Sequence, residues 1–257
     1  MNVLETKNIT MRFGGLTAVN NVSIEVPKES IISLIGPNGA GKTTFFNLLT
    51  GIYRPTEGNI NICGKPVVGL KPFEVTSLGV GRTFQNIRLF KSMTVLENVM
   101  LGQFSRTRSG FFQCVLGSKG AKAEEKKSKE IAMELLDFVG LSHKRNELAT
   151  SLPYGEQRKV EIARAMAVEP ALILLDEPAA GMNTSEKKEA QNLIKKIQQR
   201  GLTVFLIEHD MKLVMGISDR VIVLDYGNKI AEGVPQEIQK NERVIAAYLG
   251  KGGEANA

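Results

Sequence analysis

Short runs of apolar and β-branched residues mark the first third of the chain and predict strands. They occur at Val3–Ile9, Val22–Val26, Ile31–Ile35 and Gly58–Cys63. The run Ile31–Ile35 is apolar except for Ser33, which is typical of a strand buried on both faces. A glycine-rich turn follows it, and a set of apolar residues then predicts a helix that begins near Gly41. This set is Phe45, Phe46, Leu48 and Leu49.

The middle of the chain shows the spacing of helices. We expect a connection over about Val80–Phe90 and a helix from Thr94 onward. The segment Gln103–Gly120 mixes Ser, Arg, Gly and aromatic residues without a clean period, so we interpret it as an irregular insertion. Apolar residues then recur about every 3.6 positions over Ala121–Val139, which predicts a helix. A second helix is predicted over Gly155–Val168.

Strands and helices alternate in the last third of the chain. Strands are predicted at Leu172–Asp176, Thr203–Ile207 and Val221–Leu224, and helices at Glu186–Gln199 and Met211–Met215. This alternation predicts a mainly parallel sheet with crossover helices. The predicted fold class is therefore α/β with a small helical insert.

Composition is that of a globular protein. The chain has 257 residues, of which 42% are hydrophobic and 23% charged, and this length is ample for a buried core. No apolar run approaches the roughly 18 residues that cross a bilayer, and the N-terminal residues do not resemble a signal peptide. Cys63 and Cys114 are the only cysteines, so we expect ordinary thiols, no disulfide framework and a reducing compartment.

The net charge of +6 permits nucleic acid, anionic lipid or nucleotide as a partner and selects none of them. Many of the cations gather between Lys119 and Lys129, where glutamates interrupt them. Such mixed runs are usually the solvated face of a helix, and we interpret this one in that way.

The clearest chemical motif follows the run Ile31–Ile35. It reads Gly36-Pro37-Asn38-Gly39-Ala40-Gly41-Lys42-Thr43 and fits the phosphate-binding pattern G-x-x-x-x-G-K-[ST] at each fixed position. Glycines let backbone N–H groups face phosphate oxygens at the start of a helix. We expect Lys42 to reach the β- and γ-phosphates and Thr43 to ligate Mg²⁺, with Thr44 beside them in the nucleotide site. The alternative is a glycine turn with an incidental lysine.

A second motif supplies carboxylates. The predicted strand Leu172–Asp176 places Asp176 at its C-terminal end, where ligands of open α/β sheets bind, and Glu177 follows. Asp176 suits a second magnesium contact, directly or through water. Glu177 is a candidate to orient and deprotonate an attacking water.

Together these motifs resemble the ATP-binding cassette (ABC) ATPases, and the match covers nearly all of the chain. The family's signature, usually of LSGGQ type, corresponds here to Leu152-Pro153-Tyr154-Gly155-Glu156-Gln157-Arg158. In the family this signature binds the γ-phosphate of ATP held by the opposite subunit, so a working site needs a dimer. Pro153 replaces the usual Ser and Tyr154 replaces a usual Gly, which removes a hydroxyl contact. Gly155 and the start of the following helix remain available to phosphate.

The resemblance gives roles to further residues. Gln85 matches the glutamine loop, which touches magnesium or water and faces the membrane partner. His209 matches the switch histidine that contacts the γ-phosphate, whereas we expect His143 to be a surface residue. Phe13 matches the aromatic residue that stacks on adenine, with core packing as the alternative. Asn183, in the D-loop segment Ala180-Gly181-Met182-Asn183, stands where Asp is usual.

The resemblance also implies the domain organisation. It predicts one nucleotide-binding domain over residues 1–257, with a RecA-like core that is mainly parallel, an antiparallel β subdomain and a helical subdomain. Residues 1–84 and 170–257 would form the catalytic core with the β subdomain. Residues 85–169 would form the helical subdomain and the signature.

Several segments are most similar to the LivG-type ATPases of branched-chain amino-acid importers. They are Met11–Leu16, Tyr154–Arg158, Pro178–Asn183, His209–Met215, Ser109–Phe112 and Val244–Gly250. This likeness implies a peripheral subunit at the cytoplasmic face of the membrane that uses ATP and Mg²⁺. Its implied partners are a second ATPase (LivF-type, or another copy of the chain), two integral-membrane permeases and, indirectly, a periplasmic or extracellular amino-acid-binding protein. The cargo would be Leu, Ile or Val.

Three alternatives remain. A related one-cassette ATPase could serve urea import or lipopolysaccharide export. A nucleic-acid- or ribosome-acting ABC ATPase would suit the basic charge, but Lys42 and Asp176 are only 176 − 42 = 134 residues apart without sustained heptads, and one cassette is present. We therefore expect no nucleic-acid partner. A regulatory subunit without turnover would need to lack Glu177 or His209, and both are present.

Overall fold

The structure, a computed structural model, describes residues 1–104 and 119–249. The strands are β1 (Asn2–Phe13), β2 (Leu16–Pro27), β3 (Ile31–Ile35), β4 (Glu57–Ile62), β5 (Lys65–Pro66), β6 (Val80–Arg82), β7 (Leu172–Asp176), β8 (Thr203–Ile207), β9 (Arg220–Asp225) and β10 (Asn228–Gly233). The helices are α1 (Lys42–Leu49), α2 (Pro72–Ser77), α3 (Val95–Leu101), α5 (Lys119–Phe138), α6 (Tyr154–Met166), α7 (Thr184–Gln199), α8 (Met211–Ile217), α9 (Pro235–Lys240) and α10 (Glu242–Leu249). Short 3₁₀ turns cover Ser142–Lys144 and Ala149–Ser151.

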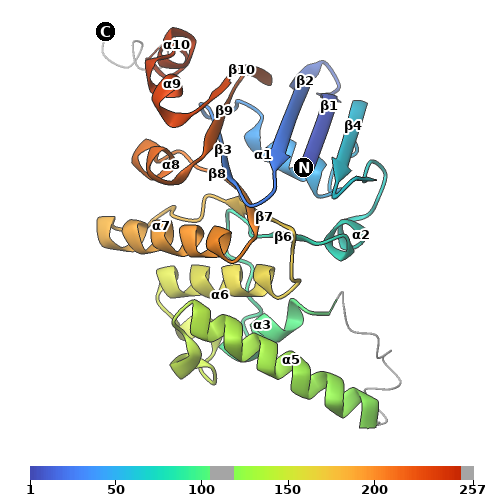
Figure 1. Cartoon of the computed structure of the whole chain (residues 1–257), viewed down its shortest axis with the longest axis vertical. Helices are drawn as coiled ribbons and strands as arrows, with labels where there is room; N and C mark the ends of the chain where they lie inside the picture. Colours follow the sequence, from blue (N-terminus) through green and yellow to red (C-terminus); the bar gives the residue numbers. More distant parts are fainter. Residues whose placement is uncertain (105–118, 250–257) are drawn as a thin grey trace.

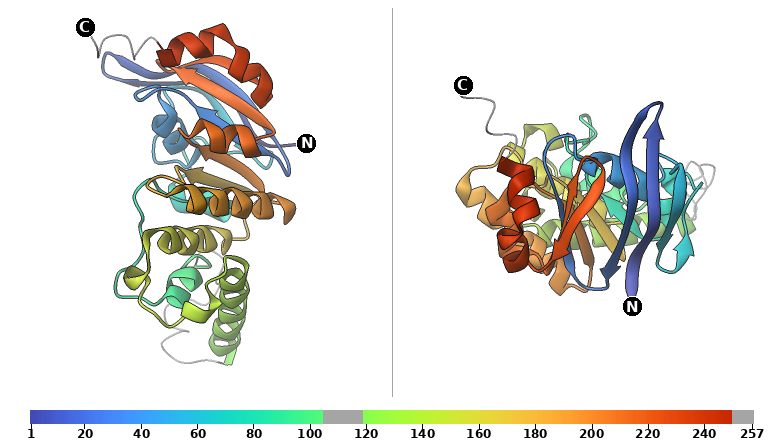
Figure 2. Two further views of the ribbon diagram at one scale, coloured as in Figure 1. Left: turned by 90° about the vertical axis from the view of Figure 1, so that its left-hand side faces the viewer. Right: turned by 90° about the horizontal axis from the view of Figure 1, so that it is seen from above.

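Two sheets and a helical end form the molecule (Figure 1). One sheet has the strand order β2-β1-β4-β5 and is antiparallel, and the other has the order β10-β9-β3-β8-β7-β6. In the second sheet all neighbouring strands are parallel except β10, which runs antiparallel to β9. Helices α3, α5 and α6 lie together at the end of the molecule away from the antiparallel sheet (Figure 2). The predicted α/β class with a mainly parallel sheet is confirmed.

The strands that are buried on both faces have the ends predicted for them. These are β3, β7 and β8, in which every residue is buried. The prediction was wrong for the connection Val80–Phe90, because its first residues form the short strand β6 beside β7. The strands predicted at Val3–Ile9 and Val22–Val26 are longer than expected and meet in one hairpin. Their solvated face carries polar residues, so an apolar run does not mark their true length.

Helix ends differ slightly from the prediction. The hydroxyl of Thr94 accepts from Glu97 N at 3.2 Å, so Thr94 caps α3 and the helix begins one residue later. Helix α5 begins two residues before the predicted Ala121, which takes Lys119 and Gly120 out of the irregular insertion. Residues 105–118 of that insertion, and Cys114 with them, lie outside the described residues. Three C-terminal elements, β10, α9 and α10, were not predicted.

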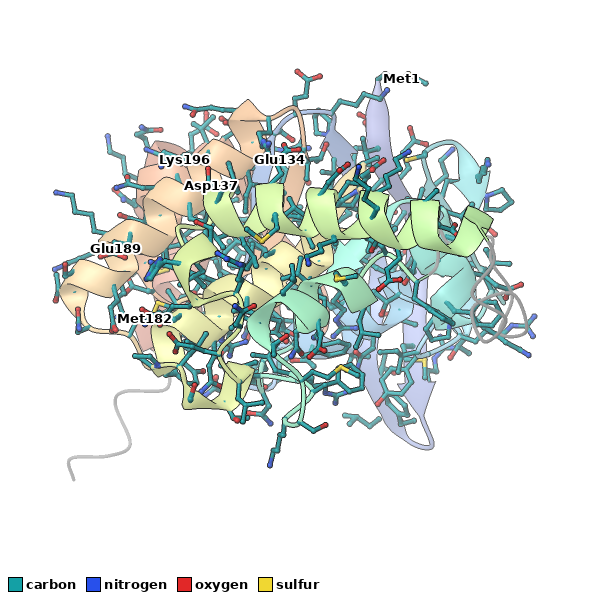
Figure 3. The ribbon with its side chains drawn as sticks, turned by 90° about the horizontal axis from the view of Figure 1, so that it is seen from below. Met1, Glu134, Asp137, Met182, Glu189 and Lys196 are labelled. Carbon is teal, nitrogen blue, oxygen red and sulfur yellow. The ribbon has the colours of Figure 1, made fainter. Side chains whose placement is uncertain are left out.

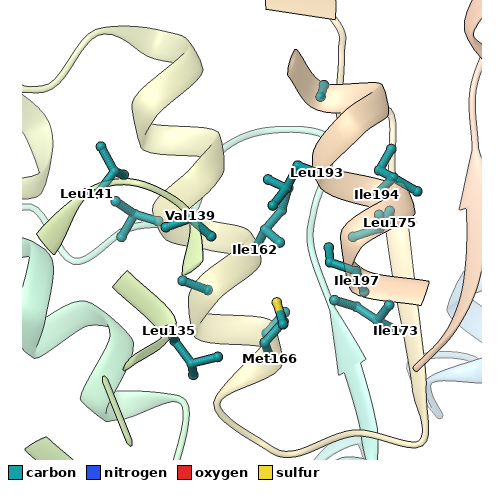
Figure 4. Packing of buried hydrophobic residues seen from close by; sticks show 14 of the residues in the cluster. Leu135, Val139, Leu141, Ile162, Met166, Ile173, Leu175, Leu193, Ile194 and Ile197 are labelled. Carbon is teal, nitrogen blue, oxygen red and sulfur yellow. The ribbon is translucent and has the colours of Figure 1, made fainter. Parts of the chain in front are cut away.

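The central sheet is covered on both faces. On one face α6 packs between α5 and α7, and its Ile162 and Met166 share a buried cluster with Leu135 of α5 and Leu193 of α7 (Figure 4). Residues of β7 alternate between the two faces, so Ile173 joins this cluster. On the other face the buried rings of α1 pack against β8. The rings of Phe46 and Phe205 lie with their centroids 5.3 Å apart.

The outer faces of α5 and α7 carry charged side chains, including Glu134, Asp137, Glu189 and Lys196 (Figure 3). Lys126, Lys127 and Lys129 of the predicted solvated face are exposed, as are Cys63 and His143. Within residues 1–104 and 119–249, no helix has both the length and the apolar content needed to span a membrane.

Candidate active site

The phosphate-loop motif forms a tight turn between β3 and α1. Gly36 has φ +152°, and a Cβ on it would stand 2.1 Å from the carbonyl oxygen of Leu224. Gly41 has φ +98°, and its Cβ would stand 2.3 Å from the carbonyl oxygen of Ala18 in β2. Both positions therefore require glycine for their conformation and for the close approach of neighbouring backbone. The loop is held between β9 and the β1–β2 hairpin.

Lys42 lies over this loop. Its Nζ donates to the carbonyl oxygens of Gly36 at 2.6 Å and Pro37 at 2.9 Å, and the residue is buried. Thr43, Asn38 and Gly39 are exposed at the loop surface, whereas Pro37 and Ala40 are buried beneath it. The half-buried Thr44 follows on α1. The loop can thus offer backbone N–H groups, an ammonium group and a hydroxyl to a phosphate chain.

Asp176 ends β7 as a buried carboxylate. Its Oδ2 lies 3.4 Å from Nη2 of Arg82, and its backbone N–H donates to the Thr83 hydroxyl at 3.1 Å. Burial raises the pKa of Asp176, and the charge of Arg82 opposes this. Burial likewise lowers the pKa of Arg82, against the effect of Asp176. Arg82 was not among the predicted site residues.

Three of the predicted site residues come together beyond β7. Gln85 Nε2 donates to Glu177 Oε2 at 3.3 Å, and His209 Nδ1 lies 3.8 Å from the same oxygen. Glu177 has φ +47°, a conformation that is uncommon for non-glycine residues, and its N–H donates to Ile207 O at 3.0 Å. The strained backbone turns the carboxylate out of the sheet edge toward exposed Gln85 and His209.

Phe13 and Gly155 lie in other surroundings. Phe13 ends β1 at the hairpin, is 41% exposed and meets the ring of Tyr53 edge to face at a centroid distance of 5.4 Å. Because Ala18 of the same hairpin touches Gly41, the hairpin packs directly on the phosphate loop. Gly155 is on α6, which contacts α3, α5 and β6, and its nearest neighbour outside the helix is Glu186 of α7.

Two comparisons with known proteins identify the family. The pattern of the ABC transporter family matches residues 19–180, and that of the branched-chain amino acid ATP-binding cassette transporter matches residues 228–254. The chain belongs to the ABC transporter family. The ATP-binding protein LivG of Salmonella typhimurium, named for high-affinity branched-chain amino acid transport, is 47% identical over 97% of this chain and 98% of its own. BraF of Pseudomonas aeruginosa is 46% identical with the same coverage.

Solved ABC cassettes have the same fold. The ADP conformation of the cassette MJ1267 superposes with a TM-score of 0.85 at 32% identity, over 97% of this chain and 99% of that one. A dimeric cassette, MJ0796 bound to ADP and Pi, gives a TM-score of 0.76 at 28% identity over 90% of this chain and 98% of that one. The chain is thus the ATP-binding subunit of an ABC transporter.

The side-chain oxygens at this site suit a magnesium ion that is also bound by the phosphates of a nucleotide. In the described ranges 1–104 and 119–249, no group of three or more His, Cys, Asp and Glu could hold a metal ion. Mg²⁺ is usually bound by one or two carboxylates together with substrate phosphates and waters. The Asp176 carboxylate, the Thr43 hydroxyl and the Gln85 amide oxygen are hard donors of the kind that this ion prefers.

Sequence reasoning missed a buried glutamate that shapes this site. Glu208 precedes His209, and its Oε1 accepts from Ala179 N at 3.0 Å. Its Oε2 accepts from the backbone N–H groups of His209 at 3.0 Å and Asp210 at 3.4 Å. Burial raises the pKa of Glu208 although these donors oppose it. Glu208 therefore joins the loops after β7 and β8. Its position directly after the apolar run Thr203–Ile207 was the only sequence signal.

Proposed function

We propose that this chain is the ATP-hydrolysing subunit of an importer for the branched-chain amino acids Leu, Ile and Val, acting at the cytoplasmic face of the membrane. The observation that carries the hydrolytic part is the convergence of Gln85 and His209 on the carboxylate of Glu177. The cargo is supported by the high identity to LivG and BraF, which are named for this transport. The match of residues 228–254 to the branched-chain cassette pattern supports it further.

The geometry suggests how each residue takes part. The loop Gly36–Gly41 and the ammonium group of Lys42 bind the β- and γ-phosphates, and Lys42 exchanges its two carbonyl contacts for phosphate oxygens. Phe13, exposed on the hairpin beside the loop, stacks on the adenine. Thr43, Asp176 and Gln85 hold Mg²⁺, which when bound neutralises charge on the phosphates.

Hydrolysis needs a base next to the water that attacks the γ-phosphate. Glu177 takes the proton of the attacking water, and Gln85 and His209 fix the carboxylate and the water. His209 and Lys42 then stabilise the charge that spreads over the transferred phosphoryl group. Glu208 anchors the backbone of His209 and so keeps the imidazole next to Glu177.

A second cassette completes the site in this proposal. Gly155 and the first turn of α6 donate backbone N–H groups to the γ-phosphate held by the partner cassette, which is a LivF-type subunit or another copy of this chain. Pro153 stands at the start of α6, where its missing N–H would have no helical partner, so it keeps the helix start intact.

The permeases would dock in a groove between the sheets and the helical end. It has a volume of about 540 Å³ and is lined by residues of α2, β6 and α3. Phe90 and Phe104 on its wall are 52% and 78% exposed, and Arg82, Arg88 and Arg164 line it. The two phenylalanines and Arg88, which is the exposed one of the three arginines, suit an apolar permease helix that carries an acidic side chain. Gln85 follows the groove residue Phe84, so docking there would reach the hydrolytic centre.

The test is transport by the assembled complex. The chain would be co-expressed with the genes next to its own, purified through a tag on this chain and placed in vesicles with its binding protein. We expect two membrane proteins and a second cassette in the complex, and ATP-driven uptake of labelled leucine that Glu177→Gln abolishes. Glu134→Gln, on the outer face of α5, is the control and should transport normally. Uptake of urea but not leucine, or copurification with nucleic acid or ribosomes, would overturn the proposal.

A further inference from the structure

One buried arginine of helix α6 binds the backbone of the glutamine loop at Phe84 and Gln85. Arg158 is 1% exposed and donates from Nη1 to the carbonyl oxygen of Phe84 and from Nη2 to that of Gln85. Nη1 also donates to Glu161 Oε2 at 2.9 Å, within the same helix. The two loop residues are thus held by a side chain that lies more than seventy positions away in the sequence.

Tyr154 completes the set of acceptors around this arginine. Its hydroxyl accepts from Arg158 Nη2 at 3.0 Å, and the guanidinium lies 5.5 Å from the centre of the tyrosine ring. In the described part of the chain Arg158 Nε has no partner, so the two terminal nitrogens carry all of its hydrogen bonds. The orientation of the guanidinium therefore depends on its few acceptors, one of which is the tyrosine hydroxyl.

The same tyrosine reaches a second loop. A Cβ placed on Gly181 would lie 3.6 Å from Cε1 of Tyr154, so the ring rests against the segment between β7 and α7. Tyr154 as a whole is 45% exposed. Glycine, the residue usual at this place in the signature, has no side chain and can make neither contact. Tyr154 therefore adds a connection between α6, the glutamine loop and the loop that contains Gly181.

We propose that Tyr154 is a positioning residue, which holds Arg158 so that the Gln85 backbone presents the Gln85 amide to Glu177. The donor and acceptor, Gln85 Nε2 and Glu177 Oε2, are 3.3 Å apart. Gln85 is exposed, so the position of its amide depends on the backbone that Arg158 binds. This inference rests on the proposed roles of Gln85 and Glu177 in hydrolysis.

The test is a double-mutant cycle in the purified full-length chain, or in its complex, read by steady-state ATP hydrolysis. Tyr154→Phe removes only the hydroxyl and keeps the ring against Gly181. We expect it to lower kcat about two- to tenfold, the effect of one hydrogen bond, with an unchanged KM for ATP. In the Gln85→Ala background, the same substitution should have no further effect, because the side chain that it positions is gone.

Two outcomes would overturn the proposal. One is an equal fall in kcat for Tyr154→Phe with and without the Gln85 side chain. The hydroxyl would then act independently of Gln85, for example on the ATP of the partner cassette. The other is a Gln85→Ala variant that turns over like the wild type. Tyr154→Gly, with the residue usual in the family, provides a second variant and should show the same dependence on Gln85. Failure of the proposed function would appear separately, as normal turnover in Glu177→Gln.

Discussion

Replacement of Arg82 by Met tests how the buried carboxylate at the end of β7 is kept charged. The guanidinium lies against Asp176 at 3.4 Å and donates to the Thr50 hydroxyl at 2.7 Å, and both charged side chains are almost fully buried. Met keeps most of the apolar stem and removes the charge. Asp176 would then be a buried anion without a counter-charge, so its pKa, which burial already raises, would rise further.

The size of the effect follows from three contributions. The Arg82 guanidinium lies 5.0 Å from the ring centre of Phe84 and 5.9 Å from that of Phe46. Such cation–π contacts stabilise by about 0.5–1 kcal/mol each, and their loss does not depend on pH. Removing one partner of a buried ion pair costs about 3–5 kcal/mol in all. Loss of the hydrogen bond to Thr50 costs about 0.5–1.5 kcal/mol more, so only the part above about 1.5–3.5 kcal/mol is due to the orphaned charge.

The charge-dependent part must change with pH in a defined direction. Above the raised pKa of the folded carboxyl the orphaned group is charged, and the whole loss of stability is present. As the pH falls through that pKa, the group takes up a proton, and the loss shrinks toward the part that does not depend on pH. Urea unfolding at pH about 7.5 and about 5 compares the loss at two pH values and shows this direction. At the higher pH we expect the midpoint of thermal unfolding to fall by about 6–10 °C.

A double variant provides the control. Arg82→Met with Asp176→Asn leaves no uncompensated charge, so its stability should recover to within about 3.5 kcal/mol of the wild type, and the part of the loss that varies with the charge of the Asp176 carboxylate should be absent. Equal losses for Arg82→Met at both pH values, or no recovery in the double variant, would refute the argument that Arg82 compensates Asp176.

Three further substitutions test local packing and hydrogen bonding. Asn183→Ala removes the side chain that caps α7 by accepting from Glu186 N at 3.0 Å. The free energy of unfolding should fall by about 1 kcal/mol in chemical unfolding, and an unchanged midpoint would contradict this. Gly81→Ala would place a Cβ 2.4 Å from Ala165 O and should cost about 1–3 kcal/mol, whereas Gly15→Ala, which meets open space, should be close to neutral. Glu208→Ala removes the acceptor of three backbone N–H groups, one buried and two partly buried, and should cost about 2–4 kcal/mol and most of the turnover; normal ATP hydrolysis would refute its anchoring role.

The structure could be predicted best in short segments where a single physical requirement determines the residue types. The phosphate loop could be predicted because glycines at fixed spacing are needed for its backbone, and the structure shows that need at Gly36 and Gly41. Strands β3, β7 and β8 could be predicted because burial on both faces makes nearly every position apolar, with Ser33, Asp176 and Thr203 as the exceptions. The edge strand β10 has no buried residue, so its sequence contains no comparable pattern.

Contacts between distant segments could not be predicted from one sequence. Arg158 and Gln85 are in different elements, and nothing in the local pattern shows that they meet. Arg82 and Glu208 were missed for the same reason, since Arg82 contacts Asp176 at the end of β7 and Glu208 contacts the loop after β7, both far away in the sequence. Asn183 shows a related limit. The sequence marks it as a departure from the usual Asp. In the structure Asn183 is the N-cap of α7, and Asn caps a helix as well as Asp does.

The central claim is that Glu177, oriented by Gln85 and His209, is the base for ATP hydrolysis. The most direct measurement is Mg²⁺-dependent ATP turnover by the wild type and by Glu177→Gln at equal, saturating ATP binding. We predict that the substitution lowers turnover by at least about a hundredfold while ATP remains bound. Turnover at the wild-type rate in the variant would contradict the claim, because the proton would then leave the attacking water by another route.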